Sequence, residues 1–149
     1  MTSLASLEGH VYPSAEPFEL GREHIRAFAK VAGVTNPVHH DVEAARAAGW
    51  PDLVAPATFA AAVAQRSEWL LWRDPEVGID FKRVVHGEER IEKQRPLIAG
   101  DVISVNLTLD RVREVRGNTM ITTRADLVDA KGEEIATVWS MIVVRGEDA

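Results

Sequence analysis

The pattern of hydrophobic positions divides the chain into a helical first half and a strand-rich second half. Residues 20–73 place apolar side chains at helical spacing, whereas residues 83–145 alternate between apolar and polar positions. Residues 22–32 predict a first helix with one apolar stripe, formed by Ile25, Phe28, Ala29 and Ala32. Gly33 follows at the place where a glycine commonly ends a helix. Asp41 can cap a short second helix, which Gly49 ends.

The segment 57–72 predicts a third helix, about 24 Å long at 1.5 Å per residue. Its first half consists almost entirely of small apolar residues, which would be unfavourable on a surface. Small side chains also allow a helix backbone to approach a sheet closely. We therefore expect a buried helix with strands wrapped around it.

Four longer strands are predicted in residues 83–96, 101–112, 118–128 and 133–144, with turns at 116–118 and 129–132. Residues 10–20 predict one more strand, which Pro13 and Pro17 restrict to an edge of the sheet. One buried helix and a long antiparallel meander indicate a single α+β domain over residues 1–149, with its core in 10–145. The expected architecture is a hotdog fold, a curved sheet around a long central helix; a generic α+β sandwich is the alternative.

The composition and net charge of the chain argue against several classes of function. The net charge is −6 with basic residues spread along the chain, which argues against a nucleic-acid partner. The chain has no cysteine, so disulfide and thiol chemistry are excluded. No signal peptide and no apolar run of membrane-spanning length is apparent. The expectation is a cytoplasmic protein that does not act in a membrane.

The segment Gly33-Val34-Thr35-Asn36-Pro37-Val38-His39 carries the most specific motif. It resembles the pattern Gly-Asp-x-Asn-Pro-(aliphatic)-His of the MaoC-like, or hydratase 2, group of hotdog enzymes, and matches five of its six specified positions. The departure is Val34, where the family has its catalytic aspartate. Residues 53–59 resemble the start of the family's central helix, and residues 83–101 resemble the N-terminal-type dehydratase half. The resemblance covers roughly residues 10–145 and is closest to small actinobacterial relatives of the (3R)-hydroxyacyl-ACP dehydratase subunits.

This resemblance implies hydration of trans-2-enoyl thioesters to (3R)-hydroxyacyl thioesters, or the reverse dehydration, on acyl-CoA or acyl carrier protein and without a cofactor. His39 is the candidate acid or base, because imidazole titrates near neutral pH, and Asn36 is a candidate for orienting water. A backbone N–H of Ala57 or Thr58, at the start of the buried helix, is the candidate donor to the thioester oxygen. Trp50 is a further candidate for binding the acyl chain.

Val34 leaves two interpretations open, because valine cannot accept a proton or hold a water. The chain is either an enoyl-thioester hydratase/dehydratase or a non-catalytic acyl-binding subunit that supports a catalytic hotdog partner. Hotdog domains typically pair through their sheets, so we expect a homodimer or a heterodimer with another hotdog subunit. An acyl-CoA thioesterase is a third interpretation, for which the buried helix offers only Glu68 and Gln65 as polar candidates.

Other polar and aromatic positions have structural explanations. Asp41 is better explained as a helix cap than as a catalyst, and the adjacent His39, His40 and Asp41 do not amount to a metal site. His40 is expected to be solvated and His86 to make a structural hydrogen bond. The charged run Glu88, Glu89, Arg90, Glu92 and Lys93 predicts a solvated or interface face. Residues 69–72 are expected to belong to the core.

Overall fold

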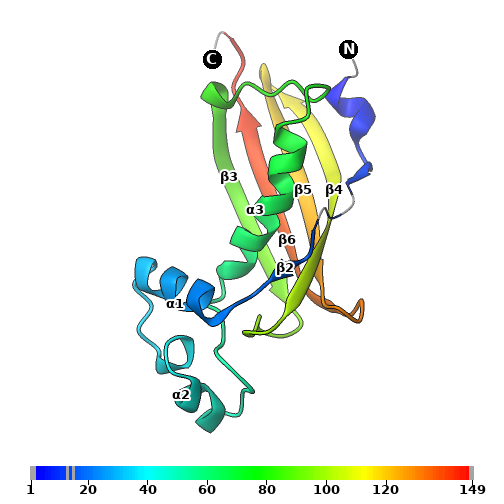
Figure 1. Cartoon of the computed structure of the whole chain (residues 1–149). Helices are drawn as coiled ribbons and strands as arrows, with labels where there is room; N and C mark the ends of the chain where they lie inside the picture. Colours follow the sequence, from blue (N-terminus) through cyan, green and yellow to red (C-terminus); the bar gives the residue numbers. More distant parts are fainter. Residues whose placement is uncertain (1–2, 13, 15, 148–149) are drawn as a thin grey trace.

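The computed structural model describes residues 3–12, 14 and 16–147. Its strands form one antiparallel sheet in the order β1-β4-β5-β6-β3, with β2 also paired to β4 (Figure 1). The strands are β1 (Val11–Tyr12), β2 (Phe18–Glu19), β3 (Val84–Lys93), β4 (Val102–Val115), β5 (Asn118–Val128) and β6 (Glu134–Val144). The helices are α1 (Arg22–Val31), α2 (Val42–Ala47) and α3 (Phe59–Trp72), with short 3-10 turns η1 (Leu4–Leu7), η2 (Pro37–His39) and η3 (Phe81–Arg83).

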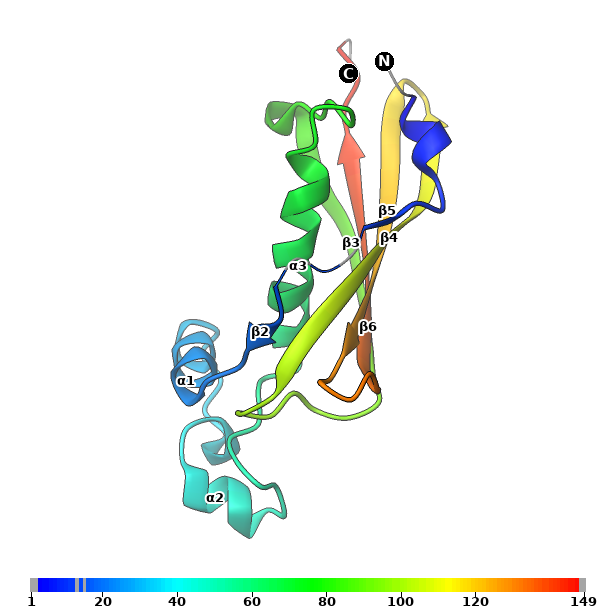
Figure 2. The same cartoon turned by 45° about the vertical axis from the view of Figure 1, so that its right-hand side comes forward.

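Helix α3 lies along one face of the curved sheet, as the turned view in Figure 2 shows. It buries eight side chains that follow helical spacing: Phe59, Ala60, Val63, Ala64, Ser67, Glu68, Leu71 and Trp72. The sheet faces them with alternate residues, among them Ile103, Val105, Leu107 and Leu109 of β4 and Ile121, Ala125 and Leu127 of β5. Because every second strand residue points to the same face, these side chains form one continuous core beneath the helix.

Helices α1 and α2 form a small lobe beyond the first turn of α3 (Figure 2). The segment that joins this lobe to α3 is clamped by backbone hydrogen bonds, from Ala55 N to Leu97 O at 2.8 Å and from Ala99 N to Leu53 O at 2.9 Å. Asp101 holds the 97–101 side of the clamp, because it accepts two hydrogen bonds from Arg95 and one from the Ile98 N–H. The lobe is thereby fixed at the N-terminal end of the central helix.

The α+β hotdog architecture, with its buried helix and its four long strands, confirms the sequence predictions. Gly33, at φ 69°, follows α1 as predicted. Residues 10–20 form two short strands rather than one, and both pair with β4. Of the two prolines used in that prediction, Pro13 lies outside the described residues.

The prediction that residues 69–72 belong to the core was wrong for two of the four. Within residues 69–72, Leu71 and Trp72 are buried, but Trp69 and Leu70 are 49% and 46% exposed. Trp69 stacks on the exposed Phe81 rather than joining the core. The charged run of β3 is exposed except for Glu89, which is half-buried. In the residues that the structure describes, no helix is both long and apolar enough to cross a membrane.

Candidate active-site loop and a second polar cluster

The loop between α1 and α2 is ordered by its own polar groups. The Val34 N–H donates to Ala29 O at 2.9 Å, and this hydrogen bond attaches the start of the loop to the last turn of α1. The Asn36 side-chain oxygen accepts from the Val38 N–H at 3.2 Å and so caps the turn η2. Pro37 suits the first position of such a turn, because its fixed φ angle matches helical geometry. The asparagine is therefore engaged through its oxygen, while its amide NH₂ remains able to donate to a water.

His39 is half-buried and attached to the segment that leads into α3. Its Nδ1 lies 2.6 Å from Val54 O, and the Val54 N–H in turn donates to Val38 O at 3.1 Å. A carbonyl oxygen can only accept, so Nδ1 must carry a proton in this contact. In the neutral imidazole, Nε2 is then unprotonated and can act as a base.

The two residues after His39 have structural roles. His40 was expected to be solvated, but it is half-buried and its Nε2 lies 2.7 Å from Val34 O. Because the Val34 carbonyl oxygen can only accept, Nε2 of His40 carries the proton in this contact. The His40 ring therefore holds the backbone in place at Val34. Asp41 accepts from the N–H groups of Glu43 and Ala44 and caps α2, as predicted.

The start of α3 presents backbone donors. The N–H of Phe59 donates to Pro56 O at 2.9 Å, while those of Ala57 and Thr58 make no hydrogen bond within the described residues. Both residues are exposed and directly precede the first turn of the helix. Free N–H groups at a helix N-terminus favour a partial negative charge, which suits a thioester oxygen.

The loop has no carboxylate that is free to pair with His39. Residues 33–54, all of them described, contain three acidic side chains: Asp41 caps α2, Glu43 pairs with Arg46, and Asp52 pairs with Arg22. The hydrogen bonds from Arg22 hold the pKa of Asp52 below its usual value. Val34 itself is half-buried. The loop therefore offers the imidazole of His39 without an acidic partner.

The predicted site residues are only partly brought together. Val54 links His39 to the segment that ends in Ala57 and Thr58, three and four residues later. Trp50 is half-buried and packs against the hydrophobic core. No recorded hydrogen bond or ring contact joins it to His39 within the described residues. Its role in acyl binding remains a prediction.

A second polar cluster lies at the other end of α3. Glu68 is only 4% exposed, and its carboxylate accepts from the Thr123 hydroxyl at 3.0 Å. Burial raises the pKa of Glu68 to about 7, with the Thr123 hydrogen bond opposing the rise and the charge of Glu89 adding to it. His86 faces the same region, with Nε2 at 2.9 Å from Glu89 Oε2 and 3.4 Å from Ser140 Oγ. The sequence identified Glu68 only as a candidate for the thioesterase interpretation; a carboxyl group within the apolar stripe was the signal for this cluster.

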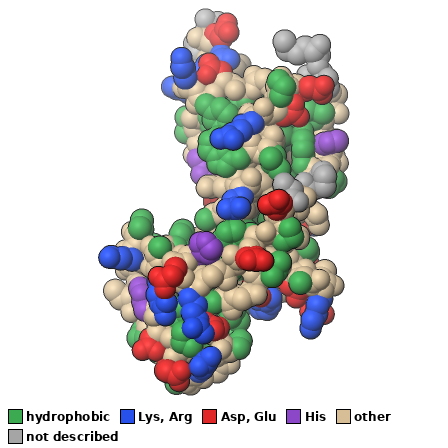
Figure 3. Space-filling model, in the orientation of Figure 1, with side chains coloured by type: hydrophobic (Ala, Val, Ile, Leu, Met, Phe, Trp, Pro, Cys, Tyr) green, Lys and Arg blue, Asp and Glu red, His purple; other side chains and the backbone are tan. Residues whose placement is uncertain are grey.

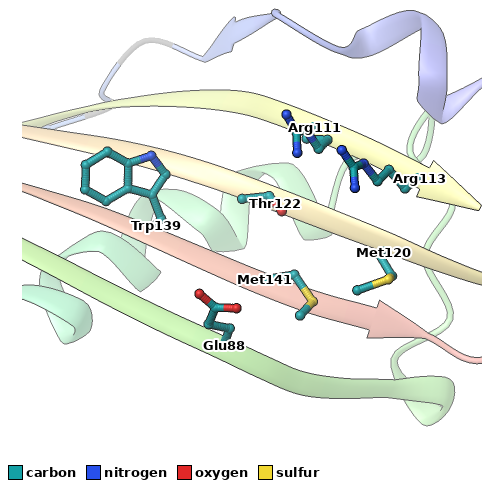
Figure 4. Close-up of a pocket in the computed structure, with 7 residues that line it drawn as sticks. All are labelled: Glu88, Arg111, Arg113, Met120, Thr122, Trp139 and Met141. Carbon is teal, nitrogen blue, oxygen red and sulfur yellow. The ribbon is translucent and has the colours of Figure 1, made fainter.

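The outer face of the sheet carries a shallow pocket of about 210 Å³, on the side away from α3 (Figure 4). Arg111 and Arg113 from β4 flank it, and Glu88 from β3 lies across it. Nearby, the Arg90 guanidinium stacks over the Trp139 ring at 3.8 Å. Charges of both signs are typical of a solvated sheet face, and none of the predicted site residues lines this pocket.

Comparison with known proteins relates this fold to one family. The model of the FAS1-like, dehydratase domain region matches residues 6–138. A UPF0336 protein of Clavibacter michiganensis subsp. michiganensis is 46% identical over 143 residues, covering 96% of each chain. A UPF0336 protein of Streptomyces coelicolor is 38% identical over 143 residues, covering 96% of this chain and 95% of the relative.

Two solved structures extend the comparison. A structure described as a MaoC-like dehydratase superposes with a TM-score of 0.89 at 29% identity, covering 98% of this chain but 44% of that chain. The C-terminally truncated HadBC (3R-hydroxyacyl-ACP dehydratase) complex from Mycobacterium tuberculosis superposes at 0.85 with 27% identity, covering 92% and 96%. The chain thus spans less than half of the first structure and nearly all of the matched chain in the second.

Proposed function

Because this chain belongs to the FAS1-like dehydratase family and has the MaoC-like hotdog fold, we propose that it serves in the cytoplasm as an (R)-specific enoyl-thioester hydratase or (3R)-hydroxyacyl-thioester dehydratase. The substrate is an acyl-CoA or acyl carrier protein thioester. The observation that carries the proposal is the contact of His39 Nδ1 with Val54 O, which leaves Nε2 of the neutral ring available as a base. This contact also ties the imidazole to the segment that presents the Ala57 and Thr58 donors.

In the hydration direction, His39 Nε2 removes a proton from water while the water oxygen bonds to C3 of the enoyl thioester. Negative charge moves to the thioester oxygen, where the N–H groups of Ala57 or Thr58 can donate to it. The resulting imidazolium is the proton source for C2, and Asn36 orients the water through its side-chain NH₂. Dehydration follows the same steps in reverse.

Pairing with a second hotdog domain is part of the proposal. Among the described residues, strand β3 ends the sheet, and one side of its backbone has no neighbouring strand. Hydrophobic side chains gather over the upper half of α3 and beside β3, where Trp69, Leu70, Phe81 and Val85 are exposed (Figure 3). An open edge next to an apolar patch favours association. Native mass measured at micromolar concentration tests this point: one chain per particle would contradict a homodimer.

A non-catalytic subunit is the second candidate, favoured by Val34 and by the engagement of Asp41, Glu43 and Asp52 elsewhere. Here the chain shapes the acyl site, and another hotdog subunit supplies the full acid/base pair. Structures described as the HadBC complex and the ChsH1-ChsH2 complex are hetero-complexes with which this chain shares the fold. Partnership with another hotdog subunit therefore has a structural precedent.

Hydration of enoyl thioesters by the purified chain separates the two candidates. The assay follows loss of the enoyl absorbance with crotonyl-CoA and with longer chains, each on CoA and on acyl carrier protein. Turnover that His39→Ala lowers by about 100-fold supports catalysis by this chain. No turnover with any of these substrates would contradict it and favour the supporting subunit.

The third candidate, a thioesterase, has one supporting observation, the buried carboxyl of Glu68 on α3. It requires Glu68 to activate a water for attack on the thioester carbonyl. Release of free CoA from a saturated acyl-CoA tests it directly, because a hydratase has no double bond to act on in that substrate.

A further inference from the structure

The pocket on the outer face of the sheet crosses four strands, on the side away from α3 (Figure 4). The pairing of these strands places one residue of each in a single row: Arg111 of β4, Thr122 of β5, Met141 of β6 and Glu88 of β3. Neighbouring strands lie about 4.8 Å apart, so the Cα atoms of Arg111 and Glu88 are separated by about 14 Å. The row therefore has opposite charges at its two ends.

Apolar side chains form the floor between these charges. Met120, Trp139 and Met141 line the pocket and are half-buried. The register of β3 shifts at Gly87, and a Cβ added to this glycine would lie 2.7 Å from Met141 Cε. The absence of a side chain at Gly87 thus gives Met141 the space that it occupies. Thioether and indole groups make a polarizable floor, which suits an apolar or aromatic group.

The charged side chains of the pocket are held apart, unlike others on the same face. Arg124 and Asp126 pair at 3.1 Å, as charges on a solvated sheet commonly do. Within the described residues, Glu88, Arg111 and Arg113 make no ion pair, although all three line one pocket. The two arginines lie two residues apart on β4 and flank the pocket together, whereas Glu88 lies across it (Figure 4).

This arrangement matches a ligand that carries both charges. A carboxylate alone would leave Glu88 without a partner, and an amine alone would leave both arginines without one. Guanidinium groups bind carboxylates through paired hydrogen bonds, and a glutamate accepts from an ammonium group. The long, exposed side chains of Arg111, Arg113 and Glu88 can bend over the floor toward such a ligand.

We infer that the outer-face pocket binds a small zwitterion, an α-amino acid with an apolar side chain. Its carboxylate is held by Arg111 and Arg113, its ammonium by Glu88, and its side chain lies on Met120 and Met141. The volume of about 210 Å³ is below the range for drug-sized ligands, which suits a molecule of this size. The site lies on the opposite face of the sheet from α3, and it is independent of the proposed hydratase activity.

Methionine methyl groups provide a direct binding measurement by NMR. The chain has three methionines, and Met120 and Met141 line the pocket. With carbon-13 in the methyl groups, Met120→Leu and Met141→Leu assign the two resonances. The probes are L-phenylalanine, N-acetyl-L-phenylalanine, which lacks the ammonium, and L-phenylalaninamide, which lacks the carboxylate. At a pH of about 6 the amine of the amide is protonated.

L-Phenylalanine should shift both methionine resonances. Because the pocket is open to solvent, each charge contact is worth about as much as an exposed ion pair. We therefore expect a dissociation constant of about 1 mM for L-phenylalanine, and binding about fivefold tighter than that of either analogue.

Charge variants assign the two contacts. Glu88→Gln should abolish the preference for L-phenylalanine over the N-acetyl analogue and keep the preference over the amide. Arg111→Gln/Arg113→Gln should do the reverse. The substituted side chains are exposed, so the fold should be retained, which thermal unfolding verifies. Arg116→Gln is the matched control, because Arg116 is an exposed arginine that does not line the pocket, and it should change neither preference.

Three results would overturn the inference. The first is no shift of either resonance at about 10 mM L-phenylalanine, well above the expected dissociation constant. The second is equal binding of the three probes to the parent protein. The third is survival of both preferences in the Glu88 and arginine variants.

Discussion

The two ends of α3 carry polar clusters that differ in their burial and in their sequence pattern. At the N-terminal end, the His39 loop is exposed or half-buried, and its polar side chains are held by backbone carbonyls and N–H groups. At the C-terminal end, Glu68 is buried beneath the helix and is held by a single hydroxyl. The first region has the family's motif but lacks its carboxylate, whereas the second has a carboxyl group without a motif. The recognisable motif of the His39 loop and the energetically costly carboxyl group of Glu68 thus lie at opposite ends of the helix.

The largest expected effect is on the free energy of unfolding and comes from Glu68, near the C-terminal end of α3. The pKa of Glu68 is raised to about 7 in the folded chain from an ordinary 4.5, so the folded state binds more protons than the unfolded state between these values. The free energy of unfolding should then decrease as pH rises from about 4.5 to 7, by about 3 kcal/mol in total. Urea unfolding at pH 4.5 and pH 8 measures the loss.

The control for this prediction is Glu68→Gln, which cannot titrate but can still accept from Thr123. Its difference in unfolding free energy between the two pH values should be smaller than that of the wild type by about 3 kcal/mol. Equal pH dependence in both proteins would show that the Glu68 carboxyl is not desolvated as described.

The next effect concerns the loop. His39→Ala should lower any enoyl-thioester hydration by about 100-fold, the usual contribution of a general acid or base. His40→Ala is the matched control, because His40 is adjacent, half-buried and also bonded to a backbone carbonyl. It should cost about 1 kcal/mol of stability, the value of one hydrogen bond, and change the rate by less than tenfold. If the two variants lost equal activity, a specific role for His39 would be refuted.

The smallest effect tests whether Asp41 belongs to the chemistry. Asp41→Ala removes two hydrogen bonds to the first turn of α2 and should cost about 1 kcal/mol of unfolding free energy. Hydration should stay within a fewfold of the wild type. A loss near that of His39→Ala would instead make Asp41 the missing acid.

Elements with a strong hydrophobic periodicity were predicted correctly from the sequence. Features that depend on contacts between distant parts of the chain were not. The alternation from Ile103 to Leu109 and the small residues of α3 were sufficient for the sheet and its buried helix, because both patterns report burial directly. The exposure of Trp69 was not predictable from the chain, since an exposed tryptophan and a core tryptophan have the same local sequence. The double strand in residues 10–20 depends on how the chain crosses β4, which no local pattern encodes.

The same division applies to the sites. The motif around Asn36 and His39 was identified from its resemblance to the MaoC-like pattern, and the structure adds the hydrogen bond that selects the imidazole tautomer. The cluster of Glu68, Thr123 and His86 joins α3, β5 and β3, with its members 18 to 55 residues apart. The bulge at Gly87 that turns His86 toward it has no short-range signature that differs from an ordinary strand glycine.

We propose above that the loop around His39 is a hydratase site that lacks only its carboxylate. The most direct measurement is hydration of crotonyl-CoA, and of longer enoyl thioesters, by Val34→Asp and by Val34→Asp/His39→Ala, with folding verified by thermal unfolding. We expect Val34→Asp to raise the rate at least tenfold above the wild type and the added His39→Ala to abolish the gain. A folded Val34→Asp protein no more active than the wild type on every chain length and carrier would contradict it.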